Sequence, residues 1–512
     1  METTTQHPEP AISKLSAEIL SYIFILNVNR ISRQSLKTSV NSSHVCRLWR
    51  RVILSYPELW SRMIFLDYPT EWLNELLRRS EPLLIDVEWL PSFSDHCLLD
   101  RPKFDCASRF RSCKLMPSTE GEWDLISTAF QVLSTPHLSE LQLKFRTLSC
   151  DPTRPIFPSS ALQQLNAPSL RSLSFTNCGP DFSFPSSLSN ITSLTVVDWY
   201  HRHGITEAPQ TCQSLFHWLQ LLSKMPQLSS VTITRSILRG VSRLPPKLMV
   251  SLPNLRLLDL SETSQHISLM LNRIRFPTSS PCKMQLFCDD SVVNSKETAS
   301  IIGVFTQSLE YQALAEHELH TLKIGANGGM HEARFEFSIS TEKIRDESEI
   351  QGPWTEERLA NELTFYDRSL FVGGTIWLSY LEPILTALDR SLIKVKSISL
   401  PCEKLNSVVL HHLKRATKIE TLVRPSPAVI ASLIPGSSGG AIPLPNLRNI
   451  IIFDRTLVKD ENNSFSDLCA LLRIHISAGS PIKHIWLRYC SVSSRNAQIL
   501  RDLGVEIRGE IC

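Results

Sequence analysis

The chain of 512 residues is 42% hydrophobic and 20% charged, and its 53 basic residues nearly balance its 50 acidic residues. The resulting formal net charge of +3 gives no electrostatic indication of a nucleic-acid or anionic-membrane partner. No segment has the roughly 18 consecutive apolar residues of a membrane span, and the polar N-terminus METTTQHPEP lacks the order of a signal peptide. We therefore expect a protein of the cytoplasm, the nucleus or both, with no nucleic-acid or membrane partner.

The cysteines agree with a reducing compartment. There are 13 of them, an odd number, spread from Cys46 to Cys512 without a C-x-x-C pair. We expect buried apolar thiols rather than disulfides or metal ligands.

The first predicted helix covers residues 13–26. Ser16 is suited to cap its N-terminus, and Glu18 in the first turn favours the helix dipole. One apolar stripe is expected to be the internal face and consists of Leu15, Ile19, Tyr22, Ile23 and Leu26. Leu20 and Phe24 extend the apolar surface beyond this stripe, and we expect them to remain available to a partner.

The second predicted helix covers residues 45–53 and ends before Pro57, because a residue ahead of proline avoids helical angles. Its apolar positions form one stripe, made of Val45, Leu48, Trp49, Val52 and Ile53. The spacer 27–40 is polar and is predicted to be a loop. Two short helices cannot bury enough surface to be stable alone, so they must pack on each other, on the following chain or on a partner.

The same region resembles the F-box. The matching segments are LSAEILSYIF (15–24), VCRLWR (45–50) and PELW (57–60), with Ser16 where the family usually has proline. The layout is similar to the large F-box families of mushroom-forming fungi, in which a helix, a strand and a degenerate leucine-rich array follow. The segment EWLNELLRRSEPLLIDVEW (71–89) fits that helix and strand more loosely.

The resemblance implies a function without chemistry of its own. Residues 11–62 would be an F-box domain that binds a Skp adaptor and, through it, a cullin-RING ligase. The chain would then be the substrate receptor of an SCF-type ubiquitin ligase and not an enzyme. By match to the motif, the adaptor-facing or fold-maintaining residues are Leu15, Glu18, Ile19, Leu20, Ile23, Phe24, Val45, Cys46 and Trp49. The alternative is a scaffolding repeat protein whose F-box-like hairpin only caps a solenoid, since solenoids need terminal caps.

Short Leu-x-x-Leu-x-Leu runs recur beyond residue 60 and predict strands. They begin at residues 138, 170, 191, 228, 255, 319, 395, 447 and 482, with a looser run at 419. Candidate helices lie between them, for example at 213–225 and 465–476. Because the runs are irregularly spaced, we expect an α/β fold with an irregular leucine-rich-repeat solenoid, in which a parallel curved sheet carries helices on its convex side.

The expected domain organisation follows these patterns. Residues 1–10 are expected to be disordered, 63–137 to be a connecting segment with the first degenerate repeats, and 138–512 to be the repeat domain. An irregular insertion is expected at about 325–394, where HEARFEFSIS (331–340) alternates like an antiparallel strand. The Gly/Ser/Pro-rich stretch 435–440 is expected to be a mobile loop.

The leucines of each strand should face the core, and the residues between them should face the open side, where repeat proteins bind partners. The candidate open-face positions are Gln142, Ser174, Thr232, Asp259, Lys323, Ser399, Ile451 and Trp486. Trp486 is the first to test, because large aromatic side chains are enriched at interface hot spots. The substrate and its contact residues stay unidentified at this stage.

Signatures of chemistry are missing from the sequence. It contains no P-loop, GxGxxG, HExxH or GxSxG motif, and the glycines of GANGGMHE (325–332) are read as a turn. The histidine pairs at 201/203, 317/320 and 411/412 have no third ligand nearby. We expect no catalytic residue, no metal and no cofactor.

Overall fold

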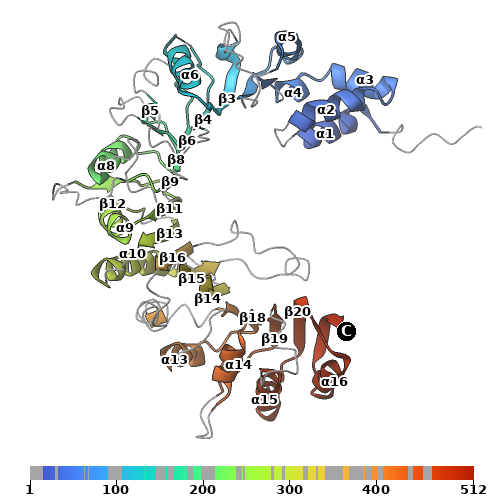
Figure 1. Ribbon diagram of the computed structural model, residues 1–512, viewed down its shortest axis with the longest axis vertical. Helices are drawn as coiled ribbons and strands as arrows, with labels where there is room; N and C mark the ends of the chain where they lie inside the picture. Colours follow the sequence, from blue (N-terminus) through green and yellow to red (C-terminus); the bar gives the residue numbers. More distant parts are fainter. Residues whose placement is uncertain are drawn as a thin grey trace, which may run out of the picture. The chain divides into compact units, whose positions relative to one another are not determined.

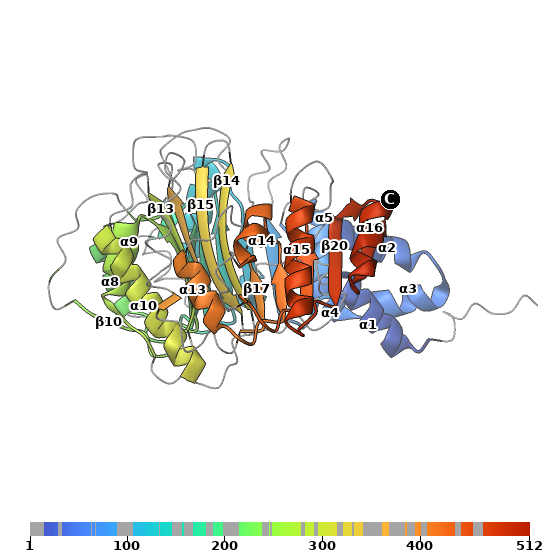
Figure 2. The ribbon, with the colours of Figure 1, turned by 90° about the horizontal axis from the view of Figure 1, so that it is seen from below.

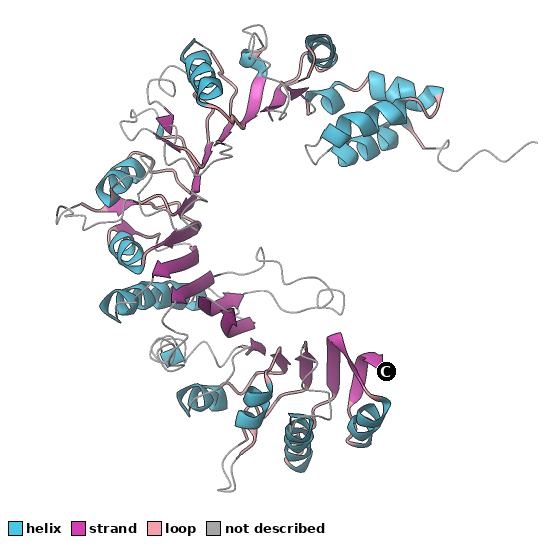
Figure 3. Cartoon of the chain, in the orientation of Figure 1, coloured by secondary structure: helices cyan, strands magenta, loops and turns pink. Residues whose placement is uncertain are grey.

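The structure is a computed structural model, drawn in Figures 1, 2 and 3. The chain divides into two compact units. Unit 1 comprises Met1–Leu228 and Arg235–Arg243, and unit 2 comprises Ser229–Thr234 and Leu244–Cys512. The structure describes residues 15–28, 33–62, 64–66, 68–89, 106–132, 134–145, 156–157, 167–180, 188–197, 214–237, 245, 248–277, 282–290, 295–314, 321–329, 332–340, 361–367, 385–386, 395–400, 407–435, 442–453 and 464–511. The residues 1–10 and most of the predicted loop 435–440 lie outside these ranges. Within them, no helix has both the length and the apolarity that crossing a membrane requires.

Unit 1 begins with four packed helices. They are α1 (Ala17–Val28), α2 (Arg33–Ser43), α3 (Arg47–Leu54) and α4 (Pro57–Ser61). The prediction of a polar loop over 27–40 is wrong, because α2 occupies much of that segment. Ser35, Ser39 and Ser43 repeat at every fourth position of α2 and are buried, so small hydroxyl side chains provide its packing face. Packing against α1 and α3 therefore outweighs the polar composition of α2.

The remainder of unit 1 is a parallel sheet with helices. In spatial order its strands are β1 (Ile64–Phe65), β2 (Ile85–Trp89), β3 (Phe110–Leu115), β4 (Glu140–Lys144), β6 (Ser172–Thr176) and β8 (Ser193–Val197). The helical segments are α5 (Thr70–Arg79), the 3₁₀ turn η3 (Ala107–Arg109), α6 (Glu120–Val132) and α8 (Leu215–Ser223). A small separate pair joins β5 (Ile156–Phe157) to β7 (Gly179–Pro180).

The register of unit 1 aligns apolar side chains into rows. One row crosses β2 to β8 and consists of Val87, Cys113, Leu141, Leu173 and Leu194, all of them buried. Trp89, Leu115, Leu143, Phe175 and Val196 form a second buried row two residues further along. Helices α6 and α8 lie on one side of these strands (Figure 1). The apolar positions of the predicted strands therefore face the core, as expected.

Unit 2 is built on a larger sheet. Its strands in spatial order are β9 (Ser230–Thr234), β11 (Leu257–Glu262), β13 (Lys283–Asp290), β16 (Asn361–Asp367), β15 (Glu332–Ser340), β14 (Thr321–Gly329), β17 (Ser397–Ser399), β18 (Thr421–Val423), β19 (Asn449–Ile452), β20 (His484–Val492) and β21 (Glu506–Ile511). Its helices are α9 (Ser264–Leu271), α10 (Ser295–Leu314), α13 (Ser407–Arg415), α14 (Pro427–Leu433), α15 (Ser464–Ser477) and α16 (Ser494–Asp502). A two-stranded pair joins β10 (Val250–Ser251) to β12 (Ile274–Arg275).

The sheet of unit 2 is parallel except around β15. This strand pairs antiparallel with both β14 and β16, as the alternation of residues 331–340 predicts. The prediction of a turn over the glycines of 325–332 is wrong for 325–329, which belong to β14. Gly325 and Gly328 pair there with Glu336 and Ala333, so backbone pairing with a neighbouring strand outweighs the low strand propensity of glycine.

A repeated turn explains why the leucine runs predict strand positions well. In the sequences APSL, MPQL and LPNL, proline occupies the second position of a four-residue turn, where its fixed φ angle is favourable. The backbone N–H of Leu170 donates to the carbonyl of Ala167 at 3.1 Å, and that of Leu228 donates to the carbonyl of Met225 at 3.1 Å. The same bond closes the turns that end at Leu255 and Leu447. In each case a strand begins two residues after the last residue of the turn.

Candidate docking surfaces

The first helix has the cap that its sequence predicts. The hydroxyl oxygen of Ser16 accepts a hydrogen bond from the backbone N–H of Ile19 at 3.5 Å, which satisfies one free donor of the first turn. A hydrogen bond from the Ser16 side chain also lowers the pKa of Glu18 below its ordinary value. Serine therefore performs the N-terminal capping of α1 at the position where proline is usual in the motif.

The internal face of α1 is the opposite of the predicted one. Leu20 is completely buried and Phe24 is nearly so, together with Ile25 and Val28. The Phe24 ring meets the Trp49 ring of α3 edge to face, with 5.2 Å between their centroids. The prediction that Leu20 and Phe24 would remain on the surface is therefore wrong.

The predicted internal stripe of α1 instead faces outward. Ile19, Tyr22 and Leu26 are 50%, 62% and 51% exposed, and we refer to these three residues as the α1 stripe. Leu15 and Ile23, which flank it, are half-buried. Because α1 is apolar around most of its circumference, its sequence pattern does not determine which side packs on the neighbouring helices. One apolar face of α1 therefore packs within the unit, and a second apolar face stays exposed.

Helix α3 begins one residue after an unusual cap. The Cys46 sulfur accepts from the backbone N–H of Trp49 at 3.5 Å, and the Cys46 carbonyl accepts from Arg50 N at 3.0 Å. Cys46 is exposed, unlike the buried thiols of Cys113, Cys178, Cys282, Cys288 and Cys469. Val45 precedes the helix and is 62% exposed, so it does not belong to the internal stripe predicted for 45–53.

The nine motif residues thus divide by exposure. The buried ones are Leu20 and Phe24, the half-buried ones are Leu15, Ile23 and Trp49, and the exposed ones are Glu18, Ile19, Val45 and Cys46. The structure adds Tyr22 and Leu26, which the motif comparison did not select although both belong to the apolar stripe of the sequence.

The PELW segment fixes the helices to the rest of unit 1. Trp60 in α4 is buried, and its indole N–H donates to the carbonyl of Ile53 at 2.9 Å. The guanidinium carbon of Arg79, in α5, lies 4.7 Å from the centre of the Trp60 ring. Shortly after α4, Ile64 in β1 pairs with Val87 in β2. Helix α4 therefore links α3 to α5 and to the first strands of the sheet.

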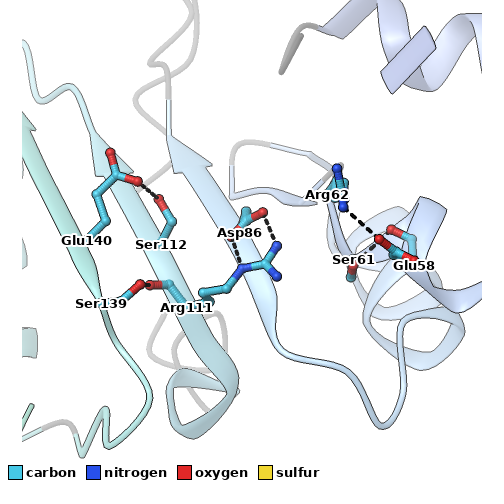
Figure 4. Close-up of polar contacts among 8 residues, drawn as sticks. All are labelled: Glu58, Ser61, Arg62, Asp86, Arg111, Ser112, Ser139 and Glu140. Carbon is cyan, nitrogen blue, oxygen red and sulfur yellow. Dashed lines mark hydrogen bonds and ion pairs between the residues drawn. The ribbon is translucent and has the colours of Figure 1, made fainter. Parts of the chain in front are cut away.

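Charged groups on the first strands of unit 1 are paired with one another (Figure 4). The Arg111 guanidinium donates to both carboxylate oxygens of Asp86, at 2.9 and 2.5 Å. Hydrogen bonding to Asp86 raises the pKa of Arg111 above its ordinary value. Beside Arg111 in β3, the Ser112 hydroxyl donates to Glu140 of the next strand, β4, at 3.1 Å, and the Gln142 amide of β4 donates to the same carboxylate at 3.0 Å.

The predicted open-face positions have mixed outcomes. Gln142, Ser174, Thr232, Asp259 and Trp486 are half-buried, as side chains on the uncovered side of a sheet can be. Ser399 and Ile451 lie in register with Trp486 through Val423, so they are on the predicted face, but both side chains are buried there. Lys323 lies in β14, and its side chain is outside the described part of the structure.

No candidate metal site is found in the described ranges. Over those residues, no three His, Cys, Asp or Glu side chains come together as a metal site would require. The two neighbouring histidines of α13, His411 and His412, contact each other with ring centroids 5.7 Å apart. Two surfaces are candidates for binding another macromolecule, namely the α1 stripe and the open faces of the strands.

Comparison with known proteins adds no assignment. A scan against models of known protein families and a search of curated proteins both found no match to this chain.

Proposed function

We propose that the chain is the substrate-receptor subunit of an SCF-type ubiquitin ligase. In this function the N-terminal helices bind a Skp adaptor as an F-box does, and the strand-and-helix units form a leucine-rich-repeat-like solenoid that binds an unidentified substrate protein. The receptor performs no chemistry itself and holds its substrate near the ubiquitin-conjugating enzyme that the cullin-RING ligase recruits.

The α1 stripe is the observation that carries the proposal. Three large apolar side chains at i, i+3 and i+7 are about half exposed on one helix, while the opposite face of that helix is already packed on α3. Exposed apolar clusters of this kind mark sites of protein interaction. The motif resemblance, which covers residues 15–24 and 45–60, specifies an adaptor as the partner.

A second observation favours the alternative of a scaffolding protein. Leu59 and Trp60 are buried, and β1 pairs with the first long strand β2, so α4 and β1 join the N-terminal helices to the edge of the unit 1 sheet. A capping function explains α4 and β1 through these contacts. It does not explain why Ile19, Tyr22 and Leu26 stay exposed.

Affinity purification of the full chain from a eukaryotic cell that contains the adaptor separates these functions. The substrate-receptor function predicts that a Skp adaptor and a cullin co-purify with the chain in comparable amounts. Recovery of the folded chain without either protein would reject it and leave the scaffolding function.

A further inference from the structure

Four neighbouring strands of unit 2 carry a continuous polar row on one face. Thr421, Asn449, His484 and Glu506 are aligned in register across β18, β19, β20 and β21. Asn449 donates to the Thr421 hydroxyl at 3.2 Å, and its amide oxygen lies 3.0 Å from His484 Nδ1. His484 Nε2 lies 3.2 Å from the Glu506 carboxylate. These bonds hold the four side chains in one arrangement.

The next row on this face presents an arginine stacked on tryptophan. Trp486 pairs in register with Ile451 on one side and with Arg508 on the other. The Arg508 guanidinium carbon lies 4.6 Å from the centre of the Trp486 ring. Arg508 Nε also donates to Glu506 at 2.9 Å, and this bond lowers the pKa of Glu506. Glu506 thereby connects Arg508 to the polar row.

A second arginine is stacked on an aromatic ring nearby. Phe453 comes two residues after Ile451, so by strand alternation it belongs to the same face. The Arg424 guanidinium carbon lies 4.3 Å from the centre of the Phe453 ring. Arg424 is exposed, and within the described residues no carboxylate forms an ion pair with it. Arg111 of unit 1 differs, because Asp86 satisfies its guanidinium.

We propose that Arg424, Phe453, Trp486 and Arg508, together called the arginine–aromatic face, bind an acidic segment of a partner protein through its Asp and Glu side chains. The proposal deepens the proposed function, on which it rests, since that partner would be the ubiquitin-ligase substrate. Stacking on Phe453 fixes the plane of the Arg424 guanidinium, and because Arg424 is exposed its N–H groups can reach a carboxylate of a partner. Trp and Arg side chains also dominate binding energy at protein interfaces.

The surroundings suit an extended peptide. Helices α14, α15 and α16 lie on the other side of β18 to β20 (Figures 1 and 3), so they do not compete for this face. Adjacent strands are about 4.8 Å apart and an extended peptide advances about 3.3 Å per residue, so about five residues span the roughly 14 Å from the first to the last of the four strands. Negative side chains on such a segment complement Arg424, which has no acidic partner of its own among the described residues.

The test is fluorescence anisotropy with the purified full chain and a labelled peptide of alternating Glu and Ala residues. A peptide with Gln in place of Glu is the charge control. We expect the acidic peptide to bind at least about tenfold more tightly than the Gln peptide, and Arg424→Gln and Trp486→Ala each to weaken binding about tenfold. Arg235→Gln is the matched control variant, because Arg235 shares the left-handed backbone of Arg424, with φ angles of 51° at both positions. It should keep the affinity of the parent.

Equal binding of the two peptides, or unchanged affinity in both Arg424→Gln and Trp486→Ala, would overturn the proposal. Circular dichroism and thermal melting of each variant identify a loss of binding that comes from unfolding, and Arg424→Lys provides a milder change that keeps the charge but loses the planar stack. The assay contains no adaptor, so its failure leaves the adaptor-binding result intact, and a failure to bind adaptor leaves the peptide result intact.

Discussion

At the scale of single residues, the sequence predicts strand facing well because the signal is local. Alternate side chains of a strand point to opposite faces, and Leu258 and Asp259 in β11 illustrate this: the leucine is completely buried and the aspartate is half-buried. Single-residue predictions fail where several groups compete. Ser399 and Ile451 occupy open-face positions by alternation, but they are buried, and strand alternation carries no information about what covers a face.

The facing of β11 gives a direct stability prediction. Leu258→Ala should lower the free energy of unfolding by about 2–5 kcal/mol, since it removes a fully buried leucine side chain. Asp259→Ala should cost much less, because it removes no core contact. Urea denaturation of both variants measures the difference. Similar losses in the two would contradict the facing of this strand.

Burial of a histidine predicts a pH dependence. His475 in α15 is completely buried, and this burial lowers its pKa below the ordinary value of 6.5. Below pH 6.5 the unfolded chain therefore binds more protons at this residue than the folded chain does. The free energy of unfolding should therefore fall as the pH drops from 6.5 toward the lower pKa of the folded state. Above pH 6.5 the histidine is neutral in both states, and the protein keeps its full stability.

Replacing this residue isolates its contribution. His475→Leu, which has a similar volume, should show a smaller loss of stability between pH 7.5 and pH 5 than the parent in urea denaturation. The parent and the variant share all other titrating groups, so the difference between their pH profiles belongs to His475. Parallel profiles would show that the buried histidine does not affect the pH dependence.

At the scale of elements, helices and strands are predictable where one pattern dominates. The regular turns with proline fix the starts of β6, β9, β11 and β19. For helix α1, the prediction of the buried face was wrong. It has apolar residues on both sides, so its existence follows from the sequence, whereas the packed side depends on contacts with Trp49, which lies 25 positions beyond Phe24. Helix α2 was missed because its packing face is made of serines rather than apolar residues.

Two glycines should respond in opposite ways to alanine. In β21, Gly509 has a φ angle of 140°, and a Cβ there would lie 2.7 Å from Leu487 Cβ and 2.8 Å from the Leu487 carbonyl oxygen. Gly509→Ala should destabilise unit 2 by about 1–3 kcal/mol, because the strained backbone and the clash with β20 both disfavour it. Thermal melting of the full chain measures this change.

The matched substitution is Gly303→Ala in α10. An added Cβ at Gly303 meets nothing within 4 Å, and alanine is favoured over glycine in a helix interior. This variant should be more stable than the parent by about 0.5–1 kcal/mol. If Gly509→Ala were as stable as Gly303→Ala, the close packing of β21 on Leu487 would be contradicted.

At the scale of the whole molecule, each unit has a sheet with helices on one side (Figure 1). The sequence predicted the α/β class and the parallel strands. It did not predict which face of α1 is exposed, because both faces are apolar. We therefore propose that an adaptor binds the α1 stripe, and not Leu20 or Phe24.

Isothermal titration calorimetry of the purified chain with a Skp adaptor measures whether the α1 stripe is the binding surface. We expect the parent to bind and the double variant Ile19→Asp/Tyr22→Asp to lose binding by at least about 100-fold, because two charges would enter an apolar contact. Ile476→Asp, at an exposed isoleucine of α15, is the matched control and should bind as the parent does. Circular dichroism should be unchanged in both, since all three positions are exposed. An unchanged affinity in the double variant, or no binding by the parent, would contradict adaptor binding at the α1 stripe.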